Sequence, residues 1–220
     1  MGLHLNYELR LPASTSPDSV AETLLALRAH ALTLPFAEVS PFLSENAAVS
    51  RGSPAQLESL RFWASLVAEP FDDDEPALHG DEASAQGFNI HPGEGCETAF
   101  VGLLRRSDAT GVHAEWYWRT FCKTQYASVV SDAHLITCHT SLVRLLDFAI
   151  QRGVDVVVQD ETHYWETRDE SRLLSEVHKM NRIVANFAGR LSDAMGDQHP
   201  VQASIFSHPR FEHLEMEQDD

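Results

Sequence analysis

At 220 residues, with 43% hydrophobic and 22% charged residues, the chain has the composition of a soluble globular protein with one large or two small domains. Its formal net charge of −17 argues against nucleic-acid binding, because contacts to phosphates need clustered Lys and Arg. The acidity is concentrated: residues 69–82 contain seven acidic residues and residues 212–220 contain five, without Lys or Arg in either stretch. We expect the first to be a loop or linker and the second to be a mobile tail.

The start of the chain has no basic segment followed by an apolar one, so we expect no signal peptide. No apolar run approaches membrane-spanning length, which predicts a protein without membrane association. The three cysteines, an odd number, argue against a disulfide scaffold. These features together predict a cytoplasmic location.

The first third of the chain predicts strands alternating with helices. Residues 4–11 alternate in polarity and predict a strand. Ser16 and Pro17 form a helix start, and apolar residues at helical spacing extend that helix over 17–32. A short apolar stretch at 35–43 predicts a second strand, weakened by its two prolines. Ser53 and Pro54 repeat the start signal for a second helix, which ends before Pro70.

From 86 to 122 the apolar period becomes two, which predicts a three-stranded antiparallel meander with glycine-containing turns. In its last strand, Trp116 and Trp118 share one face, while Tyr117 and Phe121 share the other. Aromatic residues on both faces predict that this strand is central and covered on both sides. The two tryptophans are expected in the core.

The last part predicts helix, strand, helix and a final short strand. A helix is expected near 131–152, ending at Gly153, and a β-branched strand at 154–160. Thr167 and Glu170 match a capping box for a helix over 170–195. Its apolar residues alternate three and four apart: Leu173, Val177, Met180, Val184, Phe187 and Leu191. We expect this helix to bury Val177, Met180, Val184 and Phe187. Residues 201–207 predict a last strand.

This order of elements predicts an α+β fold: a mainly antiparallel sheet that includes the meander, with about four helices packed on it. The strands at 112–122 and 154–160, joined by the helix between them, predict one parallel strand–helix–strand crossover. We expect residues 1–220 to form a single domain. A division into two subdomains near 70–85 is the alternative.

No nucleotide-binding loop or hydrolase nucleophile motif is present, and we expect no cofactor. Twelve histidines raise the question of a metal site, since His134, Cys138 and His139 lie close together on one predicted helix and Cys122 precedes them. Cys138 and His139 are adjacent, however, and point about 100° apart. Neither Cys-x-x-Cys nor His-Glu-x-x-His supports them, so we expect no metal.

The parallel crossover predicts a candidate site, because parallel strands end at the same edge of a sheet and ligands often bind there. Residues 123–126 follow the first strand and residues 160–165 follow the second. The candidate ligand-binding residues at this edge are Lys123, Tyr126, Asp160, Glu161, His163 and Tyr164. We expect Lys123 to lie within reach of Asp160 or Glu161, either as part of a site or as a structural ion pair. Glu94 and Glu97 would join this edge if the hairpin at 92–95 folded over it.

Two functions follow from these observations. The first is binding of a small polar ligand at the edge formed by 123–126 and 160–165, with catalysis left undecided. The second is a protein-binding module that uses its acidic loop and tail, such as an inhibitor or immunity-type partner of a basic protein. The sequence alone does not choose an oligomeric state or a reaction.

Overall fold

The protein is described here from a computed structural model, which describes residues 3–44, 52–68, 79–107, 114–195 and 204–208. Within these residues all strands join one sheet in the order β2-β4-β5-β6-β1-β7, and β3 also pairs with β4. Every pairing is antiparallel. The strands are β1 (Leu5–Pro12), β2 (Glu38–Val39), β3 (Leu43–Ser44), β4 (His79–His91), β5 (Ala99–Ser107), β6 (Ala114–Cys122) and β7 (Asp155–Asp160). The predicted α+β class with a mainly antiparallel sheet is confirmed.

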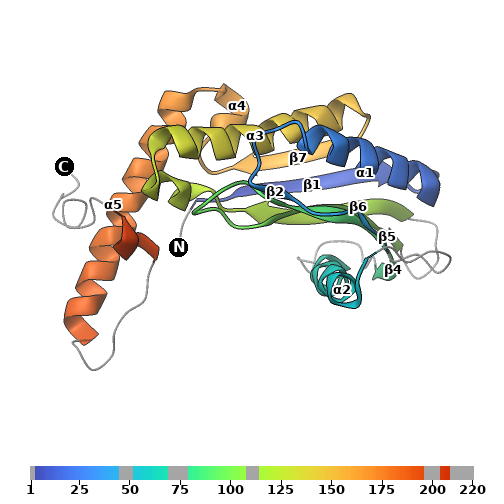
Figure 1. Cartoon of the computed structure of the whole chain (residues 1–220), viewed down its shortest axis with the longest axis horizontal. Helices are drawn as coiled ribbons and strands as arrows, with labels where there is room; N and C mark the ends of the chain where they lie inside the picture. The colour runs from blue at the N-terminus through green and yellow to red at the C-terminus, as the bar shows by residue number, and fades with distance from the viewer. Residues whose placement is uncertain (1–2, 45–51, 69–78, 108–113, 196–203, 209–220) are drawn as a thin grey trace.

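The helices cover the sheet unequally (Figure 1). Helices α1 (Pro17–Ala31) and α3 (Asp132–Gln151) lie on one face, and α2 (Pro54–Ala68) lies on the other. The short α4 (Tyr164–Thr167) follows β7, and α5 (Glu170–Met195) runs away from the end of the sheet. Of the two 3₁₀ helices, η1 (Gln125–Val129) packs against α3, and η2 (Ser204–Ser207) packs against α5 and η1. The helix starts predicted at Ser16 and Ser53 precede α1 and α2, and the Ser16 hydroxyl accepts a bond from the Ser19 amide.

The core lies between the sheet and helices α1 and α3 on one face, and buried residues of α2 extend it on the other face. Alternate residues of β1 face it, and Leu5, Tyr7 and Leu9 are buried. On β6, Trp116 and Trp118 are buried as predicted, and the Trp118 ring stacks on Phe100. Side chains of this size supply much of the apolar burial that stabilises a fold.

The opposite face of β6 is covered at one end and open at the other. The Tyr117 ring is buried beneath the guanidinium groups of Arg10 and Arg106. Phe121, four residues on, is 46% exposed. The prediction that this strand is covered on both sides therefore holds at Tyr117 and is wrong at Phe121, because α2 packs beneath β4 rather than beneath the end of β6.

Strand β1 occupies a place in the sheet that local patterns did not predict. It pairs antiparallel with β6 on one side and with β7 on the other, so β6 and β7 run in the same direction but are not neighbours. The connection through α3 therefore crosses over β1. Strands β4, β5 and β6 are adjacent in chain order.

Several expected elements differ from those observed. The stretch at 35–43 forms two very short strands, β2 and β3, which flank Pro41. Strand β4 begins at His79, inside the stretch expected to be a linker. The proposed boundary near 70–85 and both acidic segments fall largely on residues 69–78 and 212–220, outside the described residues. Of the expected strand at 201–207, residues 204–207 form the 3₁₀ helix η2 instead.

The start of α5 is not the predicted capping box. The carboxylate of Asp169 accepts bonds from the amides of Ser171 and Arg172, and the hydroxyl of Thr167 donates to the carbonyl of His163. Asp169 is the cap because Arg168, in the left-handed conformation with a φ of 56°, ends α4 immediately before it.

The apolar stripe of α5 is only partly buried. Leu173, Val177 and Val184 are buried, but Phe187 is 53% exposed, so its predicted burial is wrong. Met180 is half-buried, and Leu191 is exposed. The reason is that the second half of α5 extends beyond the sheet (Figure 1).

Candidate functional site

Strands β6 and β7 end at the same edge of the sheet, on either side of the start of β1. Leu5 pairs with Cys122 on β6 and with Asp160 on β7. Two strand spacings separate those partners, about 10 Å. Residues 123–126 and 160–165 therefore leave the sheet at the same edge, with the chain at His4 between them.

The turn at 92–97 folds over this edge. The amide of Glu97 donates to the carbonyl of Lys123 at 2.8 Å. Gly95, with a φ of 76°, lies so close to the backbone of Tyr126 that a Cβ atom there would collide with its carbonyl oxygen. Glycine is therefore needed at 95 for both its conformation and the close approach. The turn thus brings Glu97 to the edge, the arrangement that the sequence left conditional.

Lys123 pairs with Glu97 rather than with the expected carboxylates. Its Nζ lies 3.6 Å from Oε1 of Glu97. Asp160 and Glu161 bond to His139 and His4 instead, so the expected contact between Lys123 and residues 160–161 is wrong. The strand between them is the physical reason. At 3.6 Å the ion pair is longer than a hydrogen bond, and the Glu97 side chain is 46% exposed.

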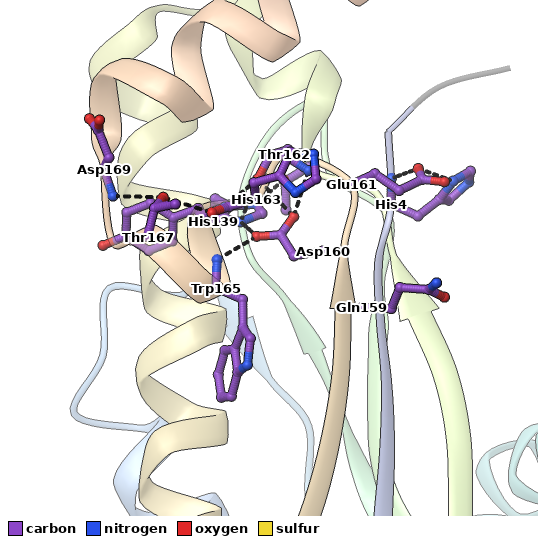
Figure 2. A network of polar contacts seen from close by, with 12 residues as sticks. His4, His139, Gln159, Asp160, Glu161, Thr162, His163, Trp165, Thr167 and Asp169 are labelled. Carbon is purple, nitrogen blue, oxygen red and sulfur yellow. Dashed lines mark hydrogen bonds and ion pairs between the residues drawn. The ribbon is translucent and has the colours of Figure 1, made fainter.

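Glu161 and Asp160 point to opposite sides of the edge (Figure 2). The Glu161 carboxylate accepts a bond from the His4 amide at 2.7 Å and lies 3.3 Å from Nδ1 of the same residue. The His4 ring packs edge-on against Phe121, with centroids 5.0 Å apart. Glu161 is exposed and Asp160 is buried.

Asp160 is the centre of a buried polar network (Figure 2). Oδ2 accepts from the Trp165 amide at 2.9 Å and lies 3.1 Å from Nε2 of His139. Oδ1 accepts from the amide and the hydroxyl of Thr162. The other ring nitrogen of His139 is 2.9 Å from the hydroxyl of Thr124, which links the network to the segment after β6.

Burial by itself raises the pKa of Asp160, but hydrogen bonding and charge from His139, with two bonds from Thr162, outweigh it and lower the pKa to about 2. Asp160 is therefore an ionised and fully bonded group. Its role in this geometry is to fix the turn after β7, since it offers no exposed surface to a ligand.

The remaining candidates lie at the rim of the edge. His163 is exposed, and its backbone is in the left-handed conformation, with a φ of 59°. The Tyr164 ring packs edge-on against His139, which places it over the buried network. Tyr126 is half-buried and packs against the cluster that contains Val184 and Ile205. Burial, and then the charge of Glu97, raise the pKa of Tyr126.

A second buried network joins this edge to α5. The side-chain amide of Gln125 donates to Asn181, and that of Asn181 donates to the hydroxyl of Ser128. Gln125 also accepts from the amide of Leu3. The sequence analysis did not single out Asn181. A signal was present in the sequence, because Asn181 is a polar residue on the same helix face as Val177 and Val184. A buried Asn at such a position must have hydrogen-bond partners.

The side chains of Cys138 and His139, which were considered above as metal ligands, point in different directions. Cys138 faces His134 and the carbonyl of Pro92, whereas His139 faces Thr124 and Asp160. In the described part of the chain no group of three His, Cys, Asp or Glu residues is arranged to hold a metal ion. The same residues include no helix long and apolar enough to span a membrane.

Comparisons with protein-family models, with curated proteins and with solved structures found no match to this chain. We therefore infer the function from the geometry of the edge.

Proposed function

We propose that the protein binds a small polar ligand at the edge where β6 and β7 end, on the side to which Glu161 points. The supporting observation is a row of four polar side chains, contributed by distant segments of the chain. They are Glu97, Lys123, His4 and Glu161. We call these four the edge row.

The pairing of the strands accounts for the order of the row. His4 precedes Leu5, while Lys123 and Glu161 follow the two residues that pair with Leu5. The amide of Glu161 continues the ladder by donating to the carbonyl of His4 at 3.1 Å. Equivalent positions on neighbouring strands place their side chains on the same side of a sheet. Glu97 completes the row from the turn above Lys123.

The charges of the row favour a ligand that carries an anionic group together with hydrogen-bond donors. Lys123 supplies an ammonium whose ion pair with Glu97 is long enough for a ligand carboxylate or phosphate to join it. Glu97 and Glu161 present partly exposed carboxylates to ligand donors. The exposed ring of Phe121 adds an apolar wall beside His4.

The backbone that carries the row is held by buried polar networks. The His139–Asp160 network fixes the turn after β7, and Gln125 with Asn181 fixes the segment after β6. Such support keeps binding groups in one arrangement before a ligand arrives, which lowers the entropic cost of binding.

The test is a thermal-shift screen of small polar metabolites against the full chain. A ligand that binds only the folded state raises the melting temperature by mass action. The matched pair of variants is Lys123→Met and Lys179→Met, since the chain has two lysines and the second is exposed on α5. We expect anionic compounds to stabilise the wild type and Lys179→Met but not Lys123→Met. Hits that stabilise all three proteins equally would contradict the proposal.

The alternative of an acidic protein-binding module depends on segments that lie largely outside the described residues. No contact among the described residues favours it.

A further inference from the structure

All three cysteines of the chain gather near the edge, beneath the turn at 92–97. Cys96 lies on that turn, Cys122 ends β6 and Cys138 lies on α3. All three are free thiols. Cys96 is partly exposed and packs against the apolar cluster that contains Cys138, while Cys122 and Cys138 are buried.

The turn lies directly on the sulfur of Cys138. The thiol donates to the carbonyl of Pro92 at 3.6 Å, and its Sγ lies 3.6 Å from Nε2 of His134. Gly93 is so close that a Cβ atom there would lie 2.7 Å from Sγ of Cys138. The amide of Cys96 closes the turn by donating to the carbonyl of Gly93 at 3.0 Å. The same turn therefore holds Cys96 close to Gly93, the residue that lies against Cys138.

The surroundings of the two thiols shift their pKa values in opposite directions. A hydrogen bond from Cys96 lowers the pKa of the Cys138 thiol to about 7, against the opposing effect of burial and with help from His134. The pKa of Cys96 is raised, first by its bond to Cys138 and then by burial. Near neutral pH the pair therefore carries a thiolate, which lies on Cys138. Burial, followed by the charges of Glu97 and Cys138, raises the pKa of Cys122.

We propose that Cys96 and Cys138 form a dithiol that is oxidised reversibly to an intramolecular disulfide by peroxides, while Cys122 stays reduced. The pair joins a partly exposed thiol to a buried one on a separate element, and both are positioned by the same turn. This inference does not use the edge row, so its success or failure is separate from that of the proposed ligand site.

The chemistry balances with hydrogen peroxide as the oxidant. The thiolate of the pair lies on Cys138, and the partly exposed Cys96 beside it marks the side from which a peroxide reaches the pair. That thiolate attacks the peroxide: an S–O bond forms, the O–O bond breaks, and the leaving hydroxide takes a proton to become water. Cys96 then attacks the sulfenic sulfur of Cys138: an S–S bond forms, the S–O bond breaks, and the hydroxide takes the Cys96 proton and leaves as a second water. Two thiols and one peroxide become one disulfide and two waters, and a dithiol reductant reverses the change.

The experiment counts thiols in the intact chain. Reduced protein is treated with hydrogen peroxide, denatured, labelled with a maleimide and weighed, and its peptides are then mapped. We expect the reduced wild type to take three labels and the oxidised wild type to take one, on Cys122, with a linked peptide that joins Cys96 to Cys138. Dithiothreitol treatment before labelling should restore three labels.

Single substitutions separate the pair from the third cysteine. Cys122→Ala should still form the disulfide and retain no label after oxidation. Cys96→Ser, at a partly exposed position, should form no intramolecular disulfide, and circular dichroism of this variant checks that it is folded. A disulfide that contains Cys122, a bond between two chains, or three labels on the treated wild type would each overturn the proposal.

Discussion

Nε2 of His139 lies 3.1 Å from Oδ2 of Asp160, and the two side chains are 1% and 0% exposed. This pair joins α3 to the end of β7 beneath the edge row. A buried pair adds little when it replaces apolar packing, but losing one partner is costly because the other charge stays buried. The pair therefore makes the edge sensitive to single substitutions.

The first prediction concerns this buried pair. Replacing His139 with Ala leaves the Asp160 carboxylate without its imidazole partner, so the free energy of unfolding should fall by about 3 kcal/mol or more. Urea denaturation measures this loss. The control is His178→Ala, which removes an exposed His–Asp pair with Asp132. That loss should stay below about 1 kcal/mol, and equal losses in the two variants would show that burial of the first pair contributes nothing.

The second prediction concerns the loss of unfolding free energy at acid pH. The pKa of Asp160 is about 2 in the folded protein, whereas an Asp in an unfolded chain titrates at about 3.9. The folded-state pKa is the lower one, so this contribution is complete above pH 4 and is lost as the pH falls towards 2. A shift of this size corresponds to about 2 to 3 kcal/mol.

Denaturation of wild type and Asp160→Asn between pH 6 and pH 2 checks this. The gap in unfolding free energy between them should narrow on the acid side of pH 4. A gap that stays constant over this range would contradict the assignment of Asp160 as an ionised, bonded group.

The third prediction contrasts two apolar residues of α5. Leu173 is fully buried, so Leu173→Ala should cost about 2–5 kcal/mol. Phe187 is 53% exposed, so Phe187→Ala should cost less than about 1 kcal/mol, although phenylalanine is the larger side chain. Thermal and urea unfolding of the two variants measure the difference. A larger loss at Phe187 would mean that the second half of α5 is covered in solution.

The fourth prediction tests the partner of Lys123. A double-mutant cycle with Lys123→Met and Glu97→Gln should give a coupling free energy of about 0.2–1 kcal/mol, as for other partly exposed ion pairs. The same cycle with Glu161→Gln in place of Glu97→Gln should be additive within about 0.5 kcal/mol, because β1 separates the two residues. The reverse pattern would place Lys123 beside Glu161.

Most helices and strands could be predicted from the sequence because their signals lie in neighbouring residues. Ser16 with Pro17 and Ser53 with Pro54 marked helix starts, and the alternation in β1 and β6 marked strands and their buried faces. Phe187 shows the limit of such patterns. Its spacing matches the buried stripe, yet burial depends on how far a helix extends past its neighbours, which the spacing does not contain.

The candidate site, likewise, could be predicted only in part. The shared edge of β6 and β7 followed from the direction of the chain, but the insertion of β1 between them is a long-range pairing with no local signature. That insertion separates Lys123 from Asp160 and brings in His4, which the sequence analysis did not consider. The turn that carries Glu97 reaches the edge because Gly95 allows close contact with Tyr126. No spacing rule predicts that contact.

Titration calorimetry with the best anionic hit tests the ligand site at the edge row most directly. Wild type and Lys179→Met should bind with equal affinity, and Lys123→Met should bind at least about tenfold more weakly, because it loses a charge-assisted hydrogen bond. Circular dichroism of the three proteins should show the same fold. Equal affinity in all three proteins would contradict a ligand site that contains Lys123.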